Sequence, residues 1–276
     1  MKPLGLVALA FGLCLTSLAL AETSQESYAA ALAALEKGAD NEAIDRLELL
    51  ADQGLAHPDA SLARAAAYIA RAEGKSARPG DLGRAAAALS EALLLRPGDA
   101  QAERGLDAVH AEIARRQTRQ GENVVVRPRL SRAIVALLPE QAWAILAALG
   151  SLVLSAGIVI RRAAAAPLWR LTGAVAIGVG IVLGSVLAGG ALAAHRLRVT
   201  SQPAVVVVTS ARLSDENGRP LPSKRGADTA TVPEGGTVYV RERREGRYLV
   251  EWGSTDGWLG ASDVRLLAGA GAGAGT

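Results

Sequence analysis

Cysteine is almost absent from this 276-residue sequence, and the one thiol, Cys14, lies in an apolar run near the N-terminus. Beyond that run the chain has no disulfide and no thiol nucleophile. The three histidines, His57, His110 and His195, are far apart, and none has a second ligand three or four residues away. Because metal ligands usually come in such local pairs, we expect neither a metal nor a cofactor.

Motifs of the common catalytic classes are also missing. The sequence contains no Walker-type glycine loop, no GxSxG and no HExxH. Aromatic residues make up 3% of the chain, and no basic stretch is interleaved with them, so we expect no nucleic-acid partner. These absences predict a protein that is not an enzyme.

Two long apolar runs, by contrast, dominate the middle of the chain. Residues 142–160 and 171–194 contain no charged side chain, and about 20 helical residues are enough to cross a bilayer. We therefore predict transmembrane helices at 141–160 and 171–194, joined by a short cytoplasmic loop at 161–170. The bases are concentrated beside these runs, with 9 bases against 2 acids over residues 119–202, where they can meet lipid headgroups.

Small residues mark one side of the second apolar run. Gly180 and Gly184 form a GxxxG spacing, which lets another helix approach closely. The partner predicted for this row is the first span, and the alternative is a second copy of the protein, which would make a homo-oligomer.

The N-terminal 21 residues predict where the soluble parts lie. Lys2, an apolar run and the small-residue ending at Ala21 have the pattern of a secretory signal peptide, and an uncleaved anchor is the alternative. Either one exports the segment that follows. The predicted location is therefore the bacterial inner membrane, crossed twice, with both soluble parts on the periplasmic side.

Residues 22–118 predict a helical domain. Helical periodicity with glycine and proline punctuation indicates five helices, near 23–37, 41–53, 59–73, 82–96 and 99–117. The packing positions are Gly80, Ala85, Leu89, Ala92 and Pro97 in one stretch, and Gly38, Ala43 and Leu47 in an earlier one. Residues 80–99 resemble the second half of a tetratricopeptide repeat, and residues 38–54 a degenerate copy. A plain bundle of helical hairpins is the alternative.

In the C-terminal part the apolar residues recur with a period of two, which is typical of β-strands. After a linker at 119–140 and the two spans, residues 203–267 predict five strands, near 204–213, 237–243, 247–252, 257–261 and 264–267. Their order and the Gly257-Trp258 pair resemble a bacterial SH3-type domain. Tyr248 and Trp258 are predicted core residues and Trp252 a candidate ligand platform. Residues 268–276 form a low-complexity glycine and alanine tail.

The whole arrangement resembles the BatE family of the bacterial aerotolerance operon. The fold class predicted is a multi-domain membrane protein, with tetratricopeptide-like helical hairpins, a transmembrane hairpin and an SH3-type barrel. The resemblance implies a scaffold in the cell envelope under stress. Its implied partners are proteins with von Willebrand factor type A domains and a MoxR-type ATPase system. The alternative function is a sensor whose SH3-type domain binds peptidoglycan.

The predicted topology is tested by fusing a reporter that is active only outside the cytoplasm after Thr118, Ala165 or Thr276. We expect activity at Thr118 and Thr276 and none at Ala165, because two spans return the chain to its starting side. Activity at Ala165 alone would place both soluble parts in the cytoplasm and would exclude the wall-binding alternative.

Overall fold

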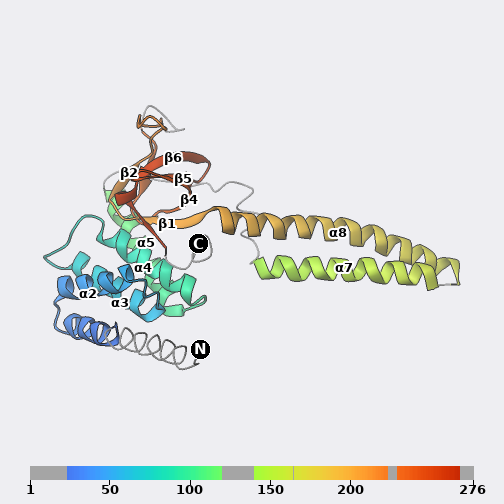
Figure 1. Ribbon diagram of the computed structural model, residues 1–276, viewed down its shortest axis with the longest axis horizontal. Coiled ribbons are helices and arrows are strands. Elements are labelled where there is room, and N and C mark those ends of the chain that lie inside the picture. The colour runs from blue at the N-terminus through green and yellow to red at the C-terminus, as the bar shows by residue number, and fades with distance from the viewer. Residues whose placement is uncertain (1–23, 120–139, 164, 223–228, 268–276) are drawn as a thin grey trace, which may run out of the picture. The chain divides into compact units, whose positions relative to one another are not determined.

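The computed structural model describes residues 24–119, 140–163, 165–222 and 229–267 (Figure 1). The chain divides into two compact units. The first combines the N-terminal part, up to Val125, with the C-terminal part from Gln202, and the second is the segment between them, Val126–Ser201.

The N-terminal part of the first unit is helical, as predicted. A helix covers described residues 24–36, and four more follow: α2 (Asp40–Asp52), α3 (Pro58–Glu73), α4 (Asp81–Leu95) and α5 (Ala100–Arg119). Helix α3 packs between α2 and α4, and α4 also packs against α5. Gly38, Gly54, Gly80 and Gly98 lie in the turns with positive φ, a conformation that glycine adopts without strain.

The C-terminal part is a small antiparallel sheet, again as predicted in outline. Its strands are β1 (Gln202–Val206), β4 (Thr237–Arg244), β5 (Arg247–Trp252), β6 (Thr255–Gly260) and β7 (Val264–Leu266), in the order β6-β5-β4-β1-β7. A 3₁₀ turn, η1 (Ala261–Asp263), precedes β7. A separate ribbon pairs β2 (Ser210–Arg212) with β3 (Thr231–Pro233).

The first predicted strand, 204–213, is wrong in one respect: the structure divides it into β1 and β2, and β3 lies within the predicted loop 214–233. The division follows from two sets of neighbours. Strand β1 pairs with β4 and β7, whereas β2 pairs with β3. The chain must leave one sheet between Val206 and Ser210 to enter the other.

Strand β1 is buried on both faces. Val205 and Val207 belong to the apolar core that they share with α2, α3, α4 and α5. Ala204 and Val206, which point the opposite way, belong to the core of the sheet. The helical and β parts, which the sequence predicts as separate domains at 22–118 and 203–267, thus pack together within one compact unit.

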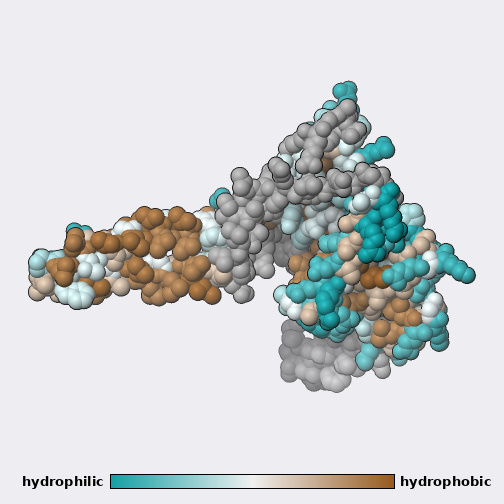
Figure 2. All heavy atoms as spheres, turned by 180° about the vertical axis from the view of Figure 1, so that it is seen from behind, coloured by the Kyte–Doolittle hydropathy of each residue, from teal (hydrophilic) through white to brown (hydrophobic). Residues whose placement is uncertain are grey.

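The second unit is a hairpin of two long helices. Helix α7 (Glu140–Ala163) and helix α8 (Pro167–Thr200) extend past the predicted apolar runs, so the connection is shorter than the predicted loop at 161–170. Both helices are long and apolar enough to cross a membrane, and only 11% and 6% of their apolar windows are buried. Figure 2 shows apolar side chains, in brown, along the outside of this hairpin.

Glycines bring α7 and α8 together. A side chain on Gly180 would meet Leu154 of α7 at 2.7 Å, and a side chain on Gly150 would meet Gly184 at 3.0 Å. The predicted GxxxG row therefore lies against α7 of the same chain. Near the open end of the hairpin the ring of Trp143 packs on Gly190 and is buried.

Several predictions fall on residues outside the described ranges. These are the signal peptide at 1–21 with Cys14, nearly all of the linker at 119–140, and the tail at 268–276.

The packing of the hairpin predicts that Gly180→Leu destabilises it, whereas Gly178→Leu does not. Nothing lies within 4 Å of a side chain added at Gly178, so this variant controls for the change in helix propensity. Overpacking a close helix contact costs about 1–3 kcal/mol, and we expect a lower midpoint of thermal unfolding in mild detergent for Gly180→Leu alone. Equal midpoints for the two variants would show that the α7–α8 contact does not depend on this glycine.

Candidate binding site between the helices and the sheet

The site begins where α4 meets β1. A side chain on Gly80 would overlap the carbonyl group of Val207, and one on Gly83 would lie 2.7 Å from the carbonyl oxygen of Val206. The backbone at Gly80 has a φ of +86°, a second reason for glycine at this position, because other residues are strained in that conformation. Only residues without a side chain allow the backbone of β1 to approach the first turn of α4 this closely.

A hydrogen bond spans the same contact. The backbone N–H of Gly83 donates to Oε1 of Glu234 at 2.8 Å, which supplies an acceptor to an N–H at the start of α4. Burial raises the pKa of Glu234, although the Gly83 N–H and the nearby Arg116 and Arg84 act in the opposite direction. The carboxyl of Glu234 is therefore easier to protonate than an exposed one.

Two buried ion pairs hold α3 against α4. Arg71 donates two hydrogen bonds to the Asp81 carboxylate, from Nη2 to Oδ1 at 2.5 Å and from Nε to Oδ2 at 3.1 Å. One heptad earlier on α3, Nη2 of Arg64 donates to Oε2 of Glu91 at 2.5 Å. Arg64, Arg71 and Glu91 are each 3% exposed, and Asp81 is 1% exposed. The paired carboxylates fix the two guanidinium groups in position.

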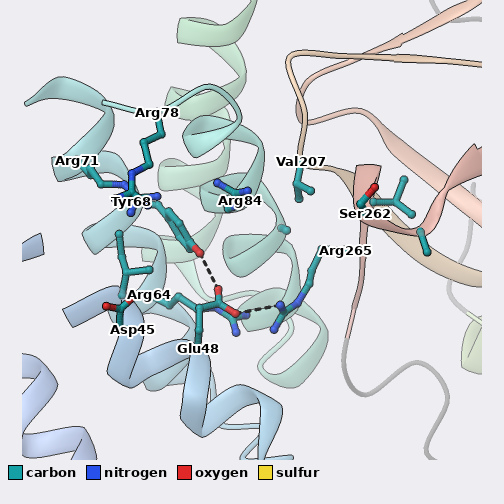
Figure 3. Close-up of a pocket in the computed structure, with 14 residues that line it drawn as sticks. Asp45, Glu48, Arg64, Tyr68, Arg71, Arg78, Arg84, Val207, Ser262 and Arg265 are labelled. Atoms are coloured by element: carbon teal, nitrogen blue, oxygen red, sulfur yellow. Dashed lines mark hydrogen bonds and ion pairs between the residues drawn. The ribbon is translucent and has the colours of Figure 1, made fainter. Parts of the chain in front are cut away.

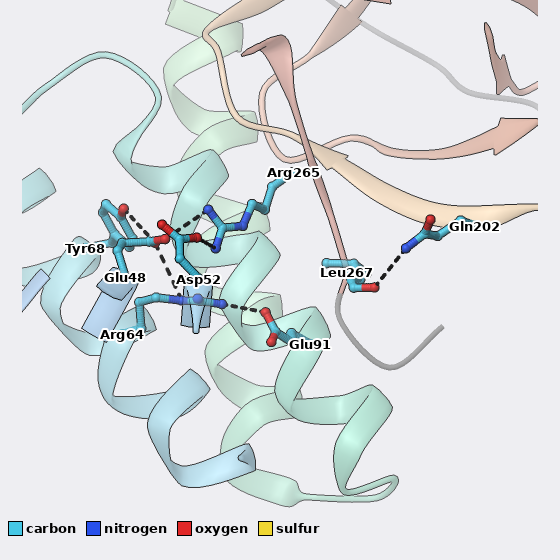
Figure 4. A network of polar contacts seen from close by, with 8 residues as sticks. All are labelled: Glu48, Asp52, Arg64, Tyr68, Glu91, Gln202, Arg265 and Leu267. Carbon is cyan, nitrogen blue, oxygen red and sulfur yellow. Dashed lines mark hydrogen bonds and ion pairs between the residues drawn. The ribbon is translucent and has the colours of Figure 1, made fainter. Parts of the chain in front are cut away.

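Glu48 of α2 joins the helices to the sheet (Figure 4). Its Oε1 accepts the hydroxyl of Tyr68 at 2.9 Å, and its Oε2 lies 2.9 Å from Nη1 of Arg265 in β7. Burial, followed by the charge and hydrogen bond of Glu48, raises the pKa of Tyr68. The phenol therefore stays protonated and serves as a donor to Glu48.

These contacts surround a pocket of about 510 Å³ (Figure 3). One wall consists of α2, α3 and α4, and the opposite wall of the end of β1, η1 and β7. Five arginines line it: Arg64, Arg71, Arg78, Arg84 and Arg265. The two acidic residues that line it are Asp45 and Glu48. The pocket is thus a polar site to which both the helical and the β part contribute.

The predicted repeat positions lie elsewhere, in the packing of the helices. Ala43, Leu47, Ala85, Leu89 and Ala92 are all buried in the shared core. Gly38 and Pro97 lie in the turns before α2 and α5. Gly80 lies against the backbone of Val207, at the end of β1. The repeat positions therefore shape the wall of the pocket without lining it.

The predicted residues of the β part do not line the pocket either. Trp258 is buried, with the guanidinium groups of Arg244 and Arg247 at 5.3 and 5.7 Å from its ring centroid. Tyr248 and Trp252 are half-buried against the core of the sheet. A side chain on Gly257 would meet Leu221 and Leu213 within 3.1 Å. Trp252, predicted as a platform, is thus partly a packing residue.

The residues that line the pocket were not predicted from the sequence, although α3 carries a signal for them. Arg64, Tyr68 and Arg71 follow one another at intervals of four and three residues, which places them on one face of the helix. That face also carries Ala67 and is buried. Charged residues on the apolar face of an alanine-rich helix indicate buried partners.

Among the described residues, no group of three or more His, Cys, Asp and Glu is arranged to hold a metal ion. His57 caps α3 instead, its Nδ1 accepting the N–H of Asp59 at 3.2 Å. Comparisons with protein-family models, with curated proteins and with solved structures found no match.

The half-buried carboxyl of Glu234 gives a pH-dependent prediction. Because its pKa is raised, its contribution to stability is complete at low pH and is lost as the pH rises through the folded-state pKa. Glu234→Gln keeps an acceptor for the Gly83 N–H without the buried charge, and Glu234→Ala removes both. At neutral pH we expect Glu234→Ala to lower the free energy of unfolding by about 1 kcal/mol and Glu234→Gln to leave it equal or higher.

Urea unfolding of the detergent-solubilised chain at several pH values measures this effect. Glu103→Gln, at an exposed position of α5, is the matched control and should follow the wild type. If Glu234→Gln proved as destabilising as Glu234→Ala, the contact with Gly83 would depend on the charge rather than on the acceptor.

Proposed function

We propose that this protein is a non-catalytic scaffold anchored in a membrane, which binds a segment of a partner protein in the pocket between its helical and β parts. The observation that carries this proposal is the composite construction of the pocket, with Glu48 and Arg64 on one wall and Arg265 on the other. A binding surface that needs both parts gives a reason for their close packing.

The pairing of Glu48, one of the two carboxylates that line the pocket, supports a binding role over a catalytic one. A general base needs a carboxylate free to take a proton. Glu48 is held by Tyr68 and Arg265, and behind the pocket wall Asp81 and Glu91 are paired with arginines. These groups are arranged to hold arginine side chains in place.

We further propose that the helices are degenerate tetratricopeptide repeats and that the sheet is an SH3-type barrel, as in the BatE family. Buried alanines such as Ala85 and Ala92, where α4 packs on its neighbours, support the first assignment. The antiparallel run β4-β5-β6, with Gly257 and Trp258 in β6, supports the second. Proteins with von Willebrand factor type A domains and a MoxR-type ATPase system are the partners proposed on this basis.

The second unit supplies the proposed anchor in the bacterial inner membrane. Trp143 near the start of α7 contacts Gly190 near the end of α8, and Gly157 near the end of α7 contacts Gly173 near the start of α8. The two helices are therefore antiparallel, which supports a two-pass topology with the flanking segments on one side. We place that side outside the cytoplasm because of the N-terminal signal pattern.

The proposal predicts that the pocket contacts another protein in cells. A photoreactive phenylalanine analogue at Ser262, an exposed residue that lines the pocket, should form an adduct of defined mass after illumination. The same analogue at Ser254, an exposed residue in the turn between β5 and β6 that does not line the pocket, is the control and should form none. Immunoblotting of the intact tagged chain measures both.

No adduct from Ser262, or equal adducts from both positions, would contradict the scaffold proposal. The wall-binding alternative would need an exposed aromatic platform, and Trp252 is half-buried. The wall-binding alternative predicts that the intact chain in detergent sediments with purified peptidoglycan. The scaffold proposal predicts no such sedimentation.

A further inference from the structure

The guanidinium group of Arg64 has hydrogen-bonding capacity that the described residues leave unused. An arginine carries five N–H donors. Within the described part of the chain, only Nη2 of Arg64 donates a hydrogen bond, to Glu91. Its Nε lies 3.7 Å from Oε1 of Glu48, too far for a hydrogen bond. Buried donors normally have partners, and Arg64 is 3% exposed and lines the pocket.

Two further arginines bring positive charge to the same space. Arg78, in the turn before α4, has no ion pair among the described residues. Its hydrogen bonds there are made by the backbone: its N–H donates to the Asp81 carboxylate and its carbonyl accepts the Asp81 N–H. Arg84 lies 3.7 Å from Oδ1 of Asp81, a carboxylate already held by Arg71, and its guanidinium stands over the Tyr68 ring at 6.0 Å. Figure 3 shows Arg64, Arg78 and Arg84 around one cavity.

One of the two acidic residues of the pocket lining is already shared among other side chains. Glu48 is shared by Tyr68, Arg64 and Arg265. Asp45 is the one carboxylate of the lining without an ion pair in the described residues, whereas two arginines of the lining, Arg78 and Arg84, are unpaired or weakly paired. The unused donors of Arg64 and the weak pairing of Arg78 and Arg84 together indicate an anionic ligand.

We propose that the pocket binds carboxylate side chains of an acidic polypeptide segment, with Arg64, Arg78 and Arg84 as donors. This inference rests on the proposed scaffold function and names the chemistry of its partner. Guanidinium groups bind carboxylates and phosphates alike. The singly charged carboxylate is favoured here because Asp45 and Glu48, in the same lining, repel a doubly charged phosphate more strongly. A pocket of about 510 Å³ has room for more than one side chain.

Fluorescence anisotropy of labelled hexaglutamate with the full chain in detergent tests the inference, and hexaglutamine serves as the uncharged probe. We expect binding of hexaglutamate only, weakened by added salt. Arg78→Gln and Arg84→Gln should each reduce affinity about tenfold or more, as expected for loss of a charge-assisted hydrogen bond. Arg115→Gln, which removes the same charge from an exposed position of α5, should have no such effect.

Three results would overturn the inference: equal binding of the two peptides, equal loss of affinity in Arg115→Gln, or displacement of hexaglutamate by inorganic phosphate at equal concentration. The last would identify a phosphate site instead. Failure here can be separated from failure of the scaffold proposal. An adduct at Ser262 without hexaglutamate binding would support the scaffold proposal and contradict the acidic ligand. Hexaglutamate binding without an adduct would support the acidic ligand and contradict the scaffold proposal.

Discussion

The carbonyl groups of Val206 and Val207 lie against the first turn of α4, and the pocket, its polar network and the packing of the sheet on the helices all depend on this approach. Any side chain at Gly80 or Gly83 would push β1 away from α4. Separation would remove the Gly83–Glu234 hydrogen bond and would draw Arg265 away from Glu48. The two glycines thus control the geometry of a site whose functional groups lie on other residues.

The buried arginines have a role that is separate from stability. Taking an ion pair out of water costs much of what the pairing returns, so Arg64–Glu91 and Arg71–Asp81 are weak evidence for a more stable fold. Their effect is on position. Each guanidinium is held by a carboxylate on α4, with its remaining donors at a fixed place in the pocket wall. A site arranged in this way loses little side-chain entropy when a ligand binds.

Local patterns were enough to predict the elements but not their assembly. Helical periodicity predicted α2 to α5, and two uncharged runs predicted α7 and α8, because these signals lie within each segment. The run Ala204–Val208 also predicted a strand, and its unbroken apolar character indicates in addition that both faces of this strand are buried. A strand with one face in water alternates between apolar and polar residues, whereas a strand without polar positions is buried on both faces. The pocket could not be predicted, because its arginines lie on α3, in the turn before α4, on α4 and on β7, and only the assembled fold brings Arg265 to Glu48.

The first unit is interrupted in sequence by the second, and this affects how the protein is made. Gly83 and Glu234 are 151 positions apart, so the contact that joins the helices to the sheet closes only after the entire hairpin has been synthesised. Until then Ala86 and Ile113, which Gly235 later covers, remain open to solvent. Late, non-local contacts leave apolar surface exposed for a longer time during folding. The newly made helices therefore pass through a period in which aggregation and chaperone binding compete with their native partner strand.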